Sequence, residues 1–397
     1  MHTEHVLITV SGPDNPGITS HLMNIIKRTN EEIVDMGQAV THGLLSLSFL
    51  LKMNKNDHPE YPVLKDLLFA AKKLGLELEF KIVEGKLKKS DGPKKEKFIL
   101  NCVSTHNISA HFIYDISHCL AKNKINILRI DNVDPLHFQS LEITTLLPNA
   151  CDLKELKSAL LTISNKYSVD IAFLKDNVFR RNKRLIVFDM DSTLIQTEVI
   201  DEMAEEFGVG DEVKAITEAA MNGEIDFNES LIQRVGKLKG LEAIKLQKIL
   251  DNLPFTLGAL DFIKTVQKVG YKVAIISGGF SFFANALKEQ LHLNYAFANE
   301  LEIVDGLLTG KVLGTIVNAE QKALLVNLIA QQENISLEQV VAIGDGANDL
   351  PMLAVAGLGI AFHAKEVVKK SAGQHMSHGP MTSILYFLGI PGVNGAN

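Results

Sequence analysis

The stretch LIVFDMDST, residues 185–193, determines the fold class of the larger part of this chain. Four consecutive apolar residues, Leu185 to Phe188, are typical of a central strand buried on both faces of a parallel sheet. Two carboxylates, Asp189 and Asp191, follow where the apolar run stops. In an extended segment a spacing of two places both on one side. A turn-capping role would explain only one of these acids, so we interpret the pair as functional.

Two more apolar runs end in polar clusters and predict further strands of the same sheet. Val273 to Ile276 is followed by SGG, residues 277–279, where a hydroxyl and unobstructed backbone N–H groups can approach phosphate oxygens. Val340 to Ile343 is followed by GDGANDLP, residues 344–351, an acid-rich loop suited to a hard cation. Helical stretches alternate with these runs, which indicates an α/β domain whose ligand site lies at the strand ends.

A long, largely helical stretch at about 199–252 separates the first two apolar runs. It is too large for a simple crossover between parallel strands, so we predict that it forms a cap over the strand ends. Two candidate charges, Glu198 and Arg234, lie at its start and within it. Taken alone, they would be interpreted as ordinary surface charges of helices.

The acid pair, the SGG turn, Lys322 at the start of a helix and the sequence GDGANDLPM occur in this order along the chain. In this order they resemble the motifs of the haloacid dehalogenase superfamily of phosphotransferases. DMDSTLIQTE, residues 189–198, makes the region similar to the phosphoserine phosphatase family within that superfamily. The resemblance covers about residues 184–390, and we place the domain at 183–391. It implies a doubly wound parallel sheet with a helical cap inserted after the first acid pair.

The resemblance also implies how the acids act. Asp189 would be the nucleophile, and the side chains of Asp189 and Asp345 together with the backbone carbonyl of Asp191 would hold Mg²⁺. A phosphate monoester repels an anionic nucleophile, so a cation must first neutralise its oxygens. Asp191 would protonate the leaving oxygen and then remove a proton from the hydrolytic water. Two protonation states of one residue would therefore serve both steps.

By the same resemblance, Glu198 would bind the ammonium group and Arg234 the carboxylate of phosphoserine, which reverses their interpretation as surface charges. The other substrate-binding residues that it implies are Ser277, Gly278, Lys322 and Asn348, with supporting roles for Met221, Phe227, Gly279 and Asp349. The predicted reaction is hydrolysis of O-phospho-L-serine through an aspartyl phosphate on Asp189, the last step of serine biosynthesis.

Two alternative functions remain open at this point. The Glu198 and Arg234 pair could accept phosphohomoserine or another amino phosphate. In another class altogether, the chain could be an amino-acid sensor with a vestigial catalytic half. The complete set of carboxylates argues against the sensor, because loss of activity usually leaves gaps in such a set.

The amino-terminal part is predicted to contain two copies of one α+β unit with the order βαββαβ. We place them at 1–84 and 98–178, on the alternation of short apolar strands with amphipathic helices. The first copy has strands near 5–10, 33–40, 44–52 and 76–83, and the second near 97–103, 125–133, 138–147 and 170–174. Between the copies, GKLKKSDGPKKEK at 85–97 is interpreted as a solvated lysine-rich linker rather than an anion site.

These two units resemble ACT domains, small-molecule sensing modules often attached to enzymes of amino-acid metabolism. In the first copy, the predicted glycine-rich turn SGPDNPG, 11–17, precedes a helix whose free N–H groups could receive the carboxylate of an amino-acid effector such as serine. The candidate effector residues are Gly12, Asp14, Asn15 and Gly17, and a plain structural turn is an equally good interpretation. The second copy has STHNIS, 104–109, at that place, without either glycine. The resemblance also implies edge-to-edge pairing in a homodimer.

Composition excludes several other classes of protein. The 397 residues carry a net charge of −7 with both signs mixed along the chain, which leaves no broad cationic surface for nucleic acid or anionic lipid. No apolar stretch approaches the ~18 residues that would span a bilayer, and the first residues lack a targeting pattern. Cys102, Cys119 and Cys151 lie far apart, so neither a disulfide framework nor a zinc site is predicted. We therefore expect a cytoplasmic enzyme.

Overall fold

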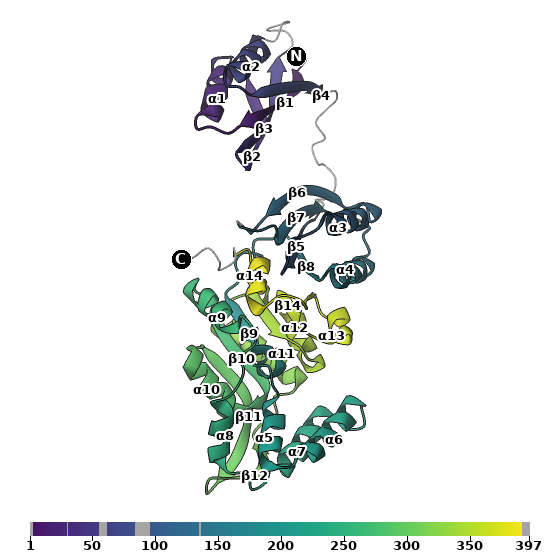
Figure 1. Ribbon diagram of the computed structural model, residues 1–397, viewed down its shortest axis with the longest axis vertical. Coiled ribbons are helices and arrows are strands. Elements are labelled where there is room, and N and C mark those ends of the chain that lie inside the picture. The colour runs from purple at the N-terminus through teal and green to yellow at the C-terminus, as the bar shows by residue number, and fades with distance from the viewer. Residues whose placement is uncertain (1–2, 30, 55–61, 84–95, 135, 391–397) are drawn as a thin grey trace. The chain divides into compact units, whose positions relative to one another are not determined.

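The computed structural model describes residues 3–29, 31–54, 62–83, 96–134 and 136–390, except for the side chains of Thr3, Asn54 and Met221 (Figure 1). The chain divides into two compact units, Met1–Lys94 and Lys95–Asn397, and each is described by itself. The predicted linker at 85–97 lies almost entirely outside the described residues. Lys97, its last residue, is the first residue of a strand.

The first unit is one antiparallel sheet with two helices on one face. Its elements are β1 (Thr3–Pro13), α1 (Ile18–Thr29), β2 (Glu32–Thr41), β3 (Leu44–Asn54), α2 (Pro62–Lys73) and β4 (Glu77–Val83), with the strand order β2-β3-β1-β4. Alternate residues of β1 and β3, such as Val6 and Leu47, are buried in one core with residues of both helices. The βαββαβ prediction is confirmed for this copy.

The predicted glycine-rich turn of the first copy is shorter than expected. Strand β1 continues through Ser11 and Gly12 as far as Pro13, which pairs with Leu44 of β3. Gly12 is needed for packing, since a Cβ there would lie 2.8 Å from Cδ2 of Leu76. The turn itself covers only the residues from Asp14 to the start of α1.

The second copy has the same topology. It consists of β5 (Lys97–Ser104), α3 (Ala110–Lys122), β6 (Asn126–Asn132), β7 (Ser140–Leu146), α4 (Leu153–Tyr167) and β8 (Val169–Lys175), in the order β6-β7-β5-β8. Ser109 begins α3 as an N-cap, its hydroxyl accepting the N–H of Phe112. The segment that replaces the glycine-rich turn in this copy therefore contains a helix cap.

The catalytic half is built on a seven-stranded sheet in the order β12-β11-β10-β9-β13-β14-β15. Its strands are β9 (Leu185–Phe188), β10 (Lys272–Phe280), β11 (Tyr295–Val304), β12 (Leu307–Leu313), β13 (Val340–Gly344), β14 (Leu358–Phe362) and β15 (Gln374–Met376). All pairings are parallel except that of β11 with β12. The three apolar runs identified in the sequence are thus the adjacent central strands β10, β9 and β13.

Helices cover both faces of this sheet. They are α9 (Ala259–Lys268), α10 (Ser281–Leu291), α11 (Ala319–Gln332), α12 (Leu350–Val355), α13 (Glu366–Ser371) and α14 (Ile384–Phe387). Ile186 and Phe188 of β9 pack in one core with residues of α9 and α10. Leu185 and Val187 pack in a second core with residues of α11 and α12. The predicted doubly wound arrangement is confirmed, because alternate side chains of one strand enter cores on opposite faces.

The stretch between β9 and β10 forms the helices α5 (Val199–Phe207), α6 (Gly210–Met221), α7 (Phe227–Lys237) and α8 (Ala243–Leu250). They occupy the region in which a cap was predicted. The chain enters and leaves this region side by side, since Ile195 forms an antiparallel bridge with Phe255. No helix of the described residues is long and apolar enough to cross a membrane.

The second ACT-like copy does not stand apart from the catalytic half, although the sequence placed a domain boundary there. Contacts join them in the single unit Lys95–Asn397. Val103 of β5 and Ala172 of β8 belong to the same apolar core as β9, and Asn101 donates a hydrogen bond to the carbonyl of Tyr386 in α14. The helix-free face of its sheet is therefore buried against the catalytic half.

Candidate active site

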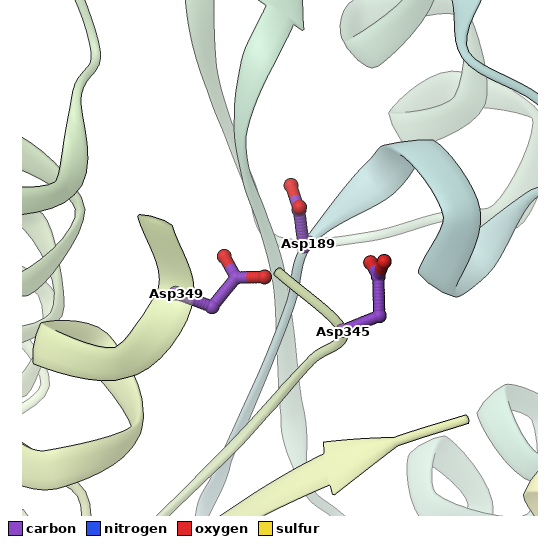
Figure 2. A group of neighbouring side chains, drawn as sticks. All are labelled: Asp189, Asp345 and Asp349. Carbon is purple, nitrogen blue, oxygen red and sulfur yellow. The ribbon is translucent and has the colours of Figure 1, made fainter. Parts of the chain in front are cut away.

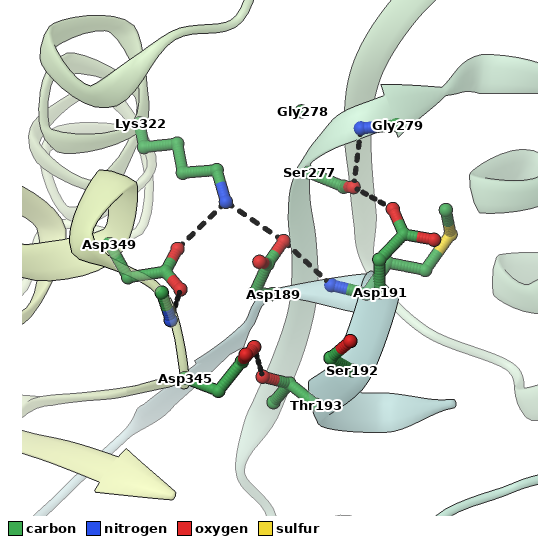
Figure 3. Close-up of polar contacts among 12 residues, drawn as sticks. Asp189, Asp191, Ser192, Thr193, Ser277, Gly278, Gly279, Lys322, Asp345 and Asp349 are labelled. Carbon is green, nitrogen blue, oxygen red and sulfur yellow. Dashed lines mark hydrogen bonds and ion pairs between the residues drawn. The ribbon is translucent and has the colours of Figure 1, made fainter. Parts of the chain in front are cut away.

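The site lies where three neighbouring parallel strands end (Figure 3). Asp189 follows β9 and Asp345 follows β13. Ser277 to Gly279 were predicted to form a turn after β10, but the strand continues through them to Phe280, with an irregular pairing to β11 after Ile276. Since β9 pairs with both β10 and β13, their carboxyl ends meet at one edge of the sheet. Sequence reasoning placed these residues together, and the structure does bring them together.

Lys322 joins two of the acids. Its Nζ lies 2.8 Å from Oδ1 of Asp189 and 2.7 Å from Oδ1 of Asp349. The lysine comes from the first turn of α11, which Asn318 begins by accepting the N–H of Gln321. Lys322 and Asp349 are fully buried. Burial lowers the pKa of Lys322, but the two carboxylates more than offset this effect and raise it above its usual value. The ammonium is therefore held in its charged form.

Asp191 has a different environment from Asp189, although they are two residues apart. Its Oδ1 accepts the N–H of Val199 at the start of α5 at 2.9 Å, and its Oδ2 accepts the hydroxyl of Ser277 at 3.2 Å. Burial, followed by the negative charge of Glu198, raises the pKa of Asp191 to about 7. A carboxyl group with such a pKa can both donate and accept a proton near neutral pH.

Three carboxylates could hold a metal ion (Figure 2). One oxygen each of Asp189, Asp345 and Asp349 lies within 4.8 Å of the others. Burial first, then the charge of Asp349, raises the pKa of Asp189 well above its usual value, and burial raises that of Asp345 to about 6. Both shifts show that the ionised carboxylates are costly at this depth, and the charge of Asp349 adds to that cost in both cases. Hard oxygen ligands with uncompensated charge fit a divalent cation, so the residues present suit the metal predicted from the sequence.

The glycines at the strand ends allow these groups to approach closely. A Cβ on Gly279 would lie 2.4 Å from Oδ2 of Asp191, and one on Gly344 would lie 2.4 Å from Oδ2 of Asp349. A Cβ on Gly278 would lie 3.0 Å from Cζ of Phe227, the first residue of α7. Phe227 thus packs over the SGG segment of β10 and brings the cap into contact with the strand ends.

The two predicted recognition charges, Glu198 and Arg234, are close enough to influence each other electrostatically. The hydroxyl of Ser192 donates a 2.7 Å hydrogen bond to Oε1 of Glu198, which is exposed. Arg234 is half-buried, and burial lowers its pKa although the negative charges of Asp201, Glu198 and Asp191 act in the opposite direction. Arg234 is therefore within electrostatic range of Asp191.

The other predicted site residues lie in three separate places. Asn348 is half-buried in the loop after β13 and lies close to Gly346, where a Cβ would be 2.1 Å from its Oδ1. The side chain of Met221, at the end of α6, lies outside the described part of the structure. The effector candidates Gly12, Asp14, Asn15 and Gly17 belong to the first unit, where Asp14 donates its N–H to the carbonyl of Gly43.

Sequence reasoning missed two residues that orient the site. Thr193, fully buried, donates its hydroxyl to Oδ1 of Asp345 at 2.8 Å. Asn299 of β11 donates to the carbonyl of Gly278 at 2.7 Å and accepts the N–H of Val317 at 2.8 Å. The first of these bonds fixes the SGG segment of β10. Asn299 gave a usable signal, since it is a polar residue near the end of an apolar stretch. Thr193 was visible only as part of the quoted motif.

The sequence of this chain is similar to those of known proteins. The haloacid dehalogenase-like hydrolase family matches residues 183–357, and an ACT domain family matches residues 4–81. Phosphoserine phosphatase SerB2 of Mycobacterium tuberculosis is 36% identical over 97% of this chain and 93% of its own length. The chain belongs to the phosphoserine phosphatase family. A phosphoserine phosphatase of Streptomyces coelicolor is 38% identical over 97% of this chain and 92% of its own.

Solved structures agree with this membership of the phosphoserine phosphatase family. The unliganded crystal structure of a probable phosphoserine phosphatase from Vibrio cholerae has a TM-score of 0.58 and 37% identity. It covers 75% of this chain, and this chain covers 87% of it. The likeness therefore extends beyond the catalytic half.

In this member of the phosphoserine phosphatase family, Lys322→Met should destabilise the metal-free protein. The substitution leaves Asp189 and Asp349 buried without their cation, which costs about 3–5 kcal/mol of unfolding free energy. Urea denaturation in the presence of EDTA measures the change. Asp345→Asn is the matched control, because it removes one of the crowded charges without touching Lys322, and it should leave stability unchanged or raise it. Equal losses in both variants would contradict the ascribed role of the ammonium.

Proposed function

We propose that this chain hydrolyses O-phospho-L-serine to L-serine and phosphate through an aspartyl phosphate on Asp189, the last step of serine biosynthesis. The observation that carries the proposal is the strand-end constellation, in which Asp189 contacts Lys322 while Asp191 contacts Ser277. Membership of the phosphoserine phosphatase family supports the substrate, since the full-length relatives carry that name.

In the first step a carboxylate oxygen of Asp189 attacks phosphorus in line with the serine oxygen. The bond from phosphorus to the serine oxygen breaks as the bond to Asp189 forms. Asp191 gives its proton to the departing oxygen, for which a pKa of about 7 is suited. The Ser277 hydroxyl, the Gly278 N–H and the Lys322 ammonium donate to the transferring group and stabilise its charge.

In the second step the ionised Asp191 removes a proton from water, which attacks the phosphorus of the aspartyl phosphate. The bond between Asp189 and phosphorus then breaks, so the carboxylate is restored and phosphate is released. Asp191 holds this position because the N–H of Val199 at the start of α5 fixes its Oδ1, while the Ser277 hydroxyl leaves Oδ2 to bind the phosphoryl group and so frees that oxygen for the proton. The same residue therefore returns to its starting protonation state after each turnover.

We assign Mg²⁺ as the cofactor, held by the side chains of Asp189 and Asp345 and the backbone carbonyl of Asp191. When bound, the ion supplies positive charge that offsets the phosphate oxygens. Asp349, whose Oδ1 contacts Lys322 and whose Oδ2 accepts the N–H of Gly346, supports the loop that carries Asp345. Mg²⁺ favours carboxylate oxygens, and the three-acid cluster supports this choice.

Specificity for phosphoserine comes from the cap. Glu198 would receive the ammonium group, exchanging its bond with Ser192 for one with the substrate, and Arg234 would bind the carboxylate in a bidentate manner. Phe227 would cover the ligand from α7, with Met221 as a further apolar contact. Phosphohomoserine would extend the distance between phosphate and ammonium by one methylene and fits this pair less well.

For the sensor alternative to hold, the catalytic half would have to be inert. The acids, Ser277 and Lys322 are instead all present, with Lys322 in contact with Asp189 and Asp349 and with Ser277 in contact with Asp191. We further propose that the first ACT domain responds to an amino acid, with serine as the candidate effector. A cytoplasmic location remains part of this proposal and fits the free cysteines, of which Cys102 and Cys119 are buried and Cys151 is half-buried.

The first test is phosphate release from L-phosphoserine with Mg²⁺, beside phosphohomoserine and p-nitrophenyl phosphate. Asp189→Asn should lower kcat for all three at least about a thousandfold, because it removes the nucleophile while keeping the side-chain shape. The unmodified enzyme should prefer phosphoserine. Hydrolysis of the aryl phosphate alone would keep the mechanism and reject the substrate, whereas no hydrolysis of any ester would favour the sensor.

Thr193→Val should weaken Mg²⁺ binding about 10- to 100-fold while leaving kcat at saturating Mg²⁺ close to that of the unmodified enzyme. Valine has nearly the same shape but cannot donate to Oδ1 of Asp345. Calorimetric titration with Mg²⁺ gives the affinity. Thr217→Val is the control, because that hydroxyl donates to the carbonyl of Val213 within α6. An unchanged affinity for Thr193→Val would contradict the orienting role.

We also propose a homodimer that assembles through the ACT sheets. The edge strand β2 is exposed along its whole length and includes the apolar residues Ile33, Val34, Met36 and Val40. Sedimentation velocity of the full chain should give a dimer, and adding a charge with Val34→Glu should shift it toward monomer. A monomeric unmodified protein would overturn this part of the proposal.

A further inference from the structure

An aspartate of the second ACT-like copy is tied directly to the catalytic half. Asp170, in β8, is fully buried on the helix-free face of its sheet, opposite Val103 of β5. Its Oδ1 accepts the backbone N–H of Ser377 at 2.6 Å, and its Oδ2 accepts that of Gly379 at 2.8 Å. The N–H of His378, between them, lies 3.1 to 3.2 Å from both oxygens. One carboxylate thus fixes three consecutive peptide groups.

The loop fixed by Asp170 leads immediately into the short 3₁₀ helix η4 (Met381–Ser383). Its packing is tight, since a Cβ on Gly379 would lie 2.5 Å from Oγ of Ser383. The carbonyl of Gly379 is also bonded to Nε2 of His363 at 3.0 Å. A shift of the loop would therefore be passed on to η4 rather than absorbed within the loop.

Helix η4 in turn contacts the segment where the chain leaves the cap. Met381 donates its N–H to the carbonyl of Leu257 at 2.9 Å. Gly258 has φ +78°, and a Cβ there would lie 3.1 Å from the backbone nitrogen of Thr382. Only glycine allows both this conformation and this close approach. The position of residues 257–258 is thus set by η4.

The two preceding residues, 255–256, pair with residues 193–195, and these two segments, which connect the cap to the sheet, are here called the cap hinge. Thr256 donates its N–H to the carbonyl of Leu194 at 3.0 Å and its hydroxyl to the carbonyl of Thr193 at 2.7 Å. Phe255 forms the antiparallel bridge with Ile195. Residues 193–195 follow Asp191 after one intervening residue, so both segments of the cap hinge are connected to the loop that carries Asp189 and Asp191.

We propose that Asp170 is a positioning residue for the cap hinge, acting through residues 377–379, η4 and Leu257 to set how the cap presents Glu198 and Arg234 to the substrate. The second ACT-like copy is then a built-in part of the cap mechanism. The inference rests on the proposed function only for the identity of the substrate. The connection itself depends on hydrogen bonds within the unit Lys95–Asn397.

Asp170→Asn tests the proposal because it keeps the shape but turns one acceptor oxygen into an amide that repels a backbone N–H. The readout is the ratio of kcat/KM for phosphoserine to kcat/KM for p-nitrophenyl phosphate, which lacks the groups that Glu198 and Arg234 bind. Loss of folded protein lowers both values equally and leaves the ratio unchanged. We expect the ratio to fall about tenfold, as a misplaced cap loses specific binding before it loses the strand-end chemistry.

The matched control is Gln374→Ala. Gln374 of β15 accepts the N–H of Phe173 at 2.8 Å and donates to its carbonyl at 2.9 Å, so this change weakens the same domain contact without touching the hinge connection. It should lower thermal stability but keep the ratio. Gly258→Ala disturbs the connection from its other end and should lower the ratio in the same direction as Asp170→Asn.

Hydrogen exchange gives a measurement independent of any substrate. The amides of Met381 and Thr256 should exchange faster in Asp170→Asn than in Gln374→Ala, because their hydrogen bonds form the connection. An unchanged ratio together with unchanged exchange at Thr256 would overturn the proposal, as would equal effects of Asp170→Asn and Gln374→Ala. If the unmodified enzyme does not prefer phosphoserine, the substrate proposal fails while the exchange data still decide the role of Asp170.

Discussion

The buried ammonium of Lys322 is the interaction on which the site depends. It contacts Asp189 at the end of β9 and Asp349 in the loop after β13, so one side chain from α11 holds two strand ends in register. Neither carboxylate could remain at this depth without a counter-charge, because the desolvation of an isolated ion exceeds what packing can offset. Around this fixed point the remaining acids are placed close enough to repel one another.

That repulsion is a cost which the rest of the fold must offset. Burial is the largest cause of the raised pKa values of Asp189, Asp191 and Asp345, and neighbouring negative charges raise all three further. Two apolar cores, one on each face of the central strands, keep the acids from moving apart. A phosphatase can use the same cluster of acids, since they attract a divalent cation whose positive charge then also offsets the phosphate oxygens.

Much of this arrangement could be predicted from the sequence, because apolar four-residue strands and their polar ends are local features. The doubly wound sheet, both βαββαβ units and the convergence of Asp189, Ser277 and Asp345 follow from such patterns. What could not be predicted depends on long-range contacts. Thr193 is a single polar residue whose partner, Asp345, lies 152 positions further along the chain. The docking of the second ACT-like copy was missed for the same reason, since an aspartate in a strand gives no local sign of the loop it binds.

The two ACT-like copies have diverged in the face that their helices leave uncovered. In the second copy this face carries Asn101, Glu142 and Asp170, all buried and bonded to parts of the chain outside that copy. In the first copy the position that corresponds to Asn101 in the strand pairing is Thr9, which is exposed. A ligand could bind to this face of the second copy only if the hydrogen bonds to the catalytic half were broken. The proposed sensing is therefore assigned to the first copy, and the second copy has the proposed role of positioning the cap hinge.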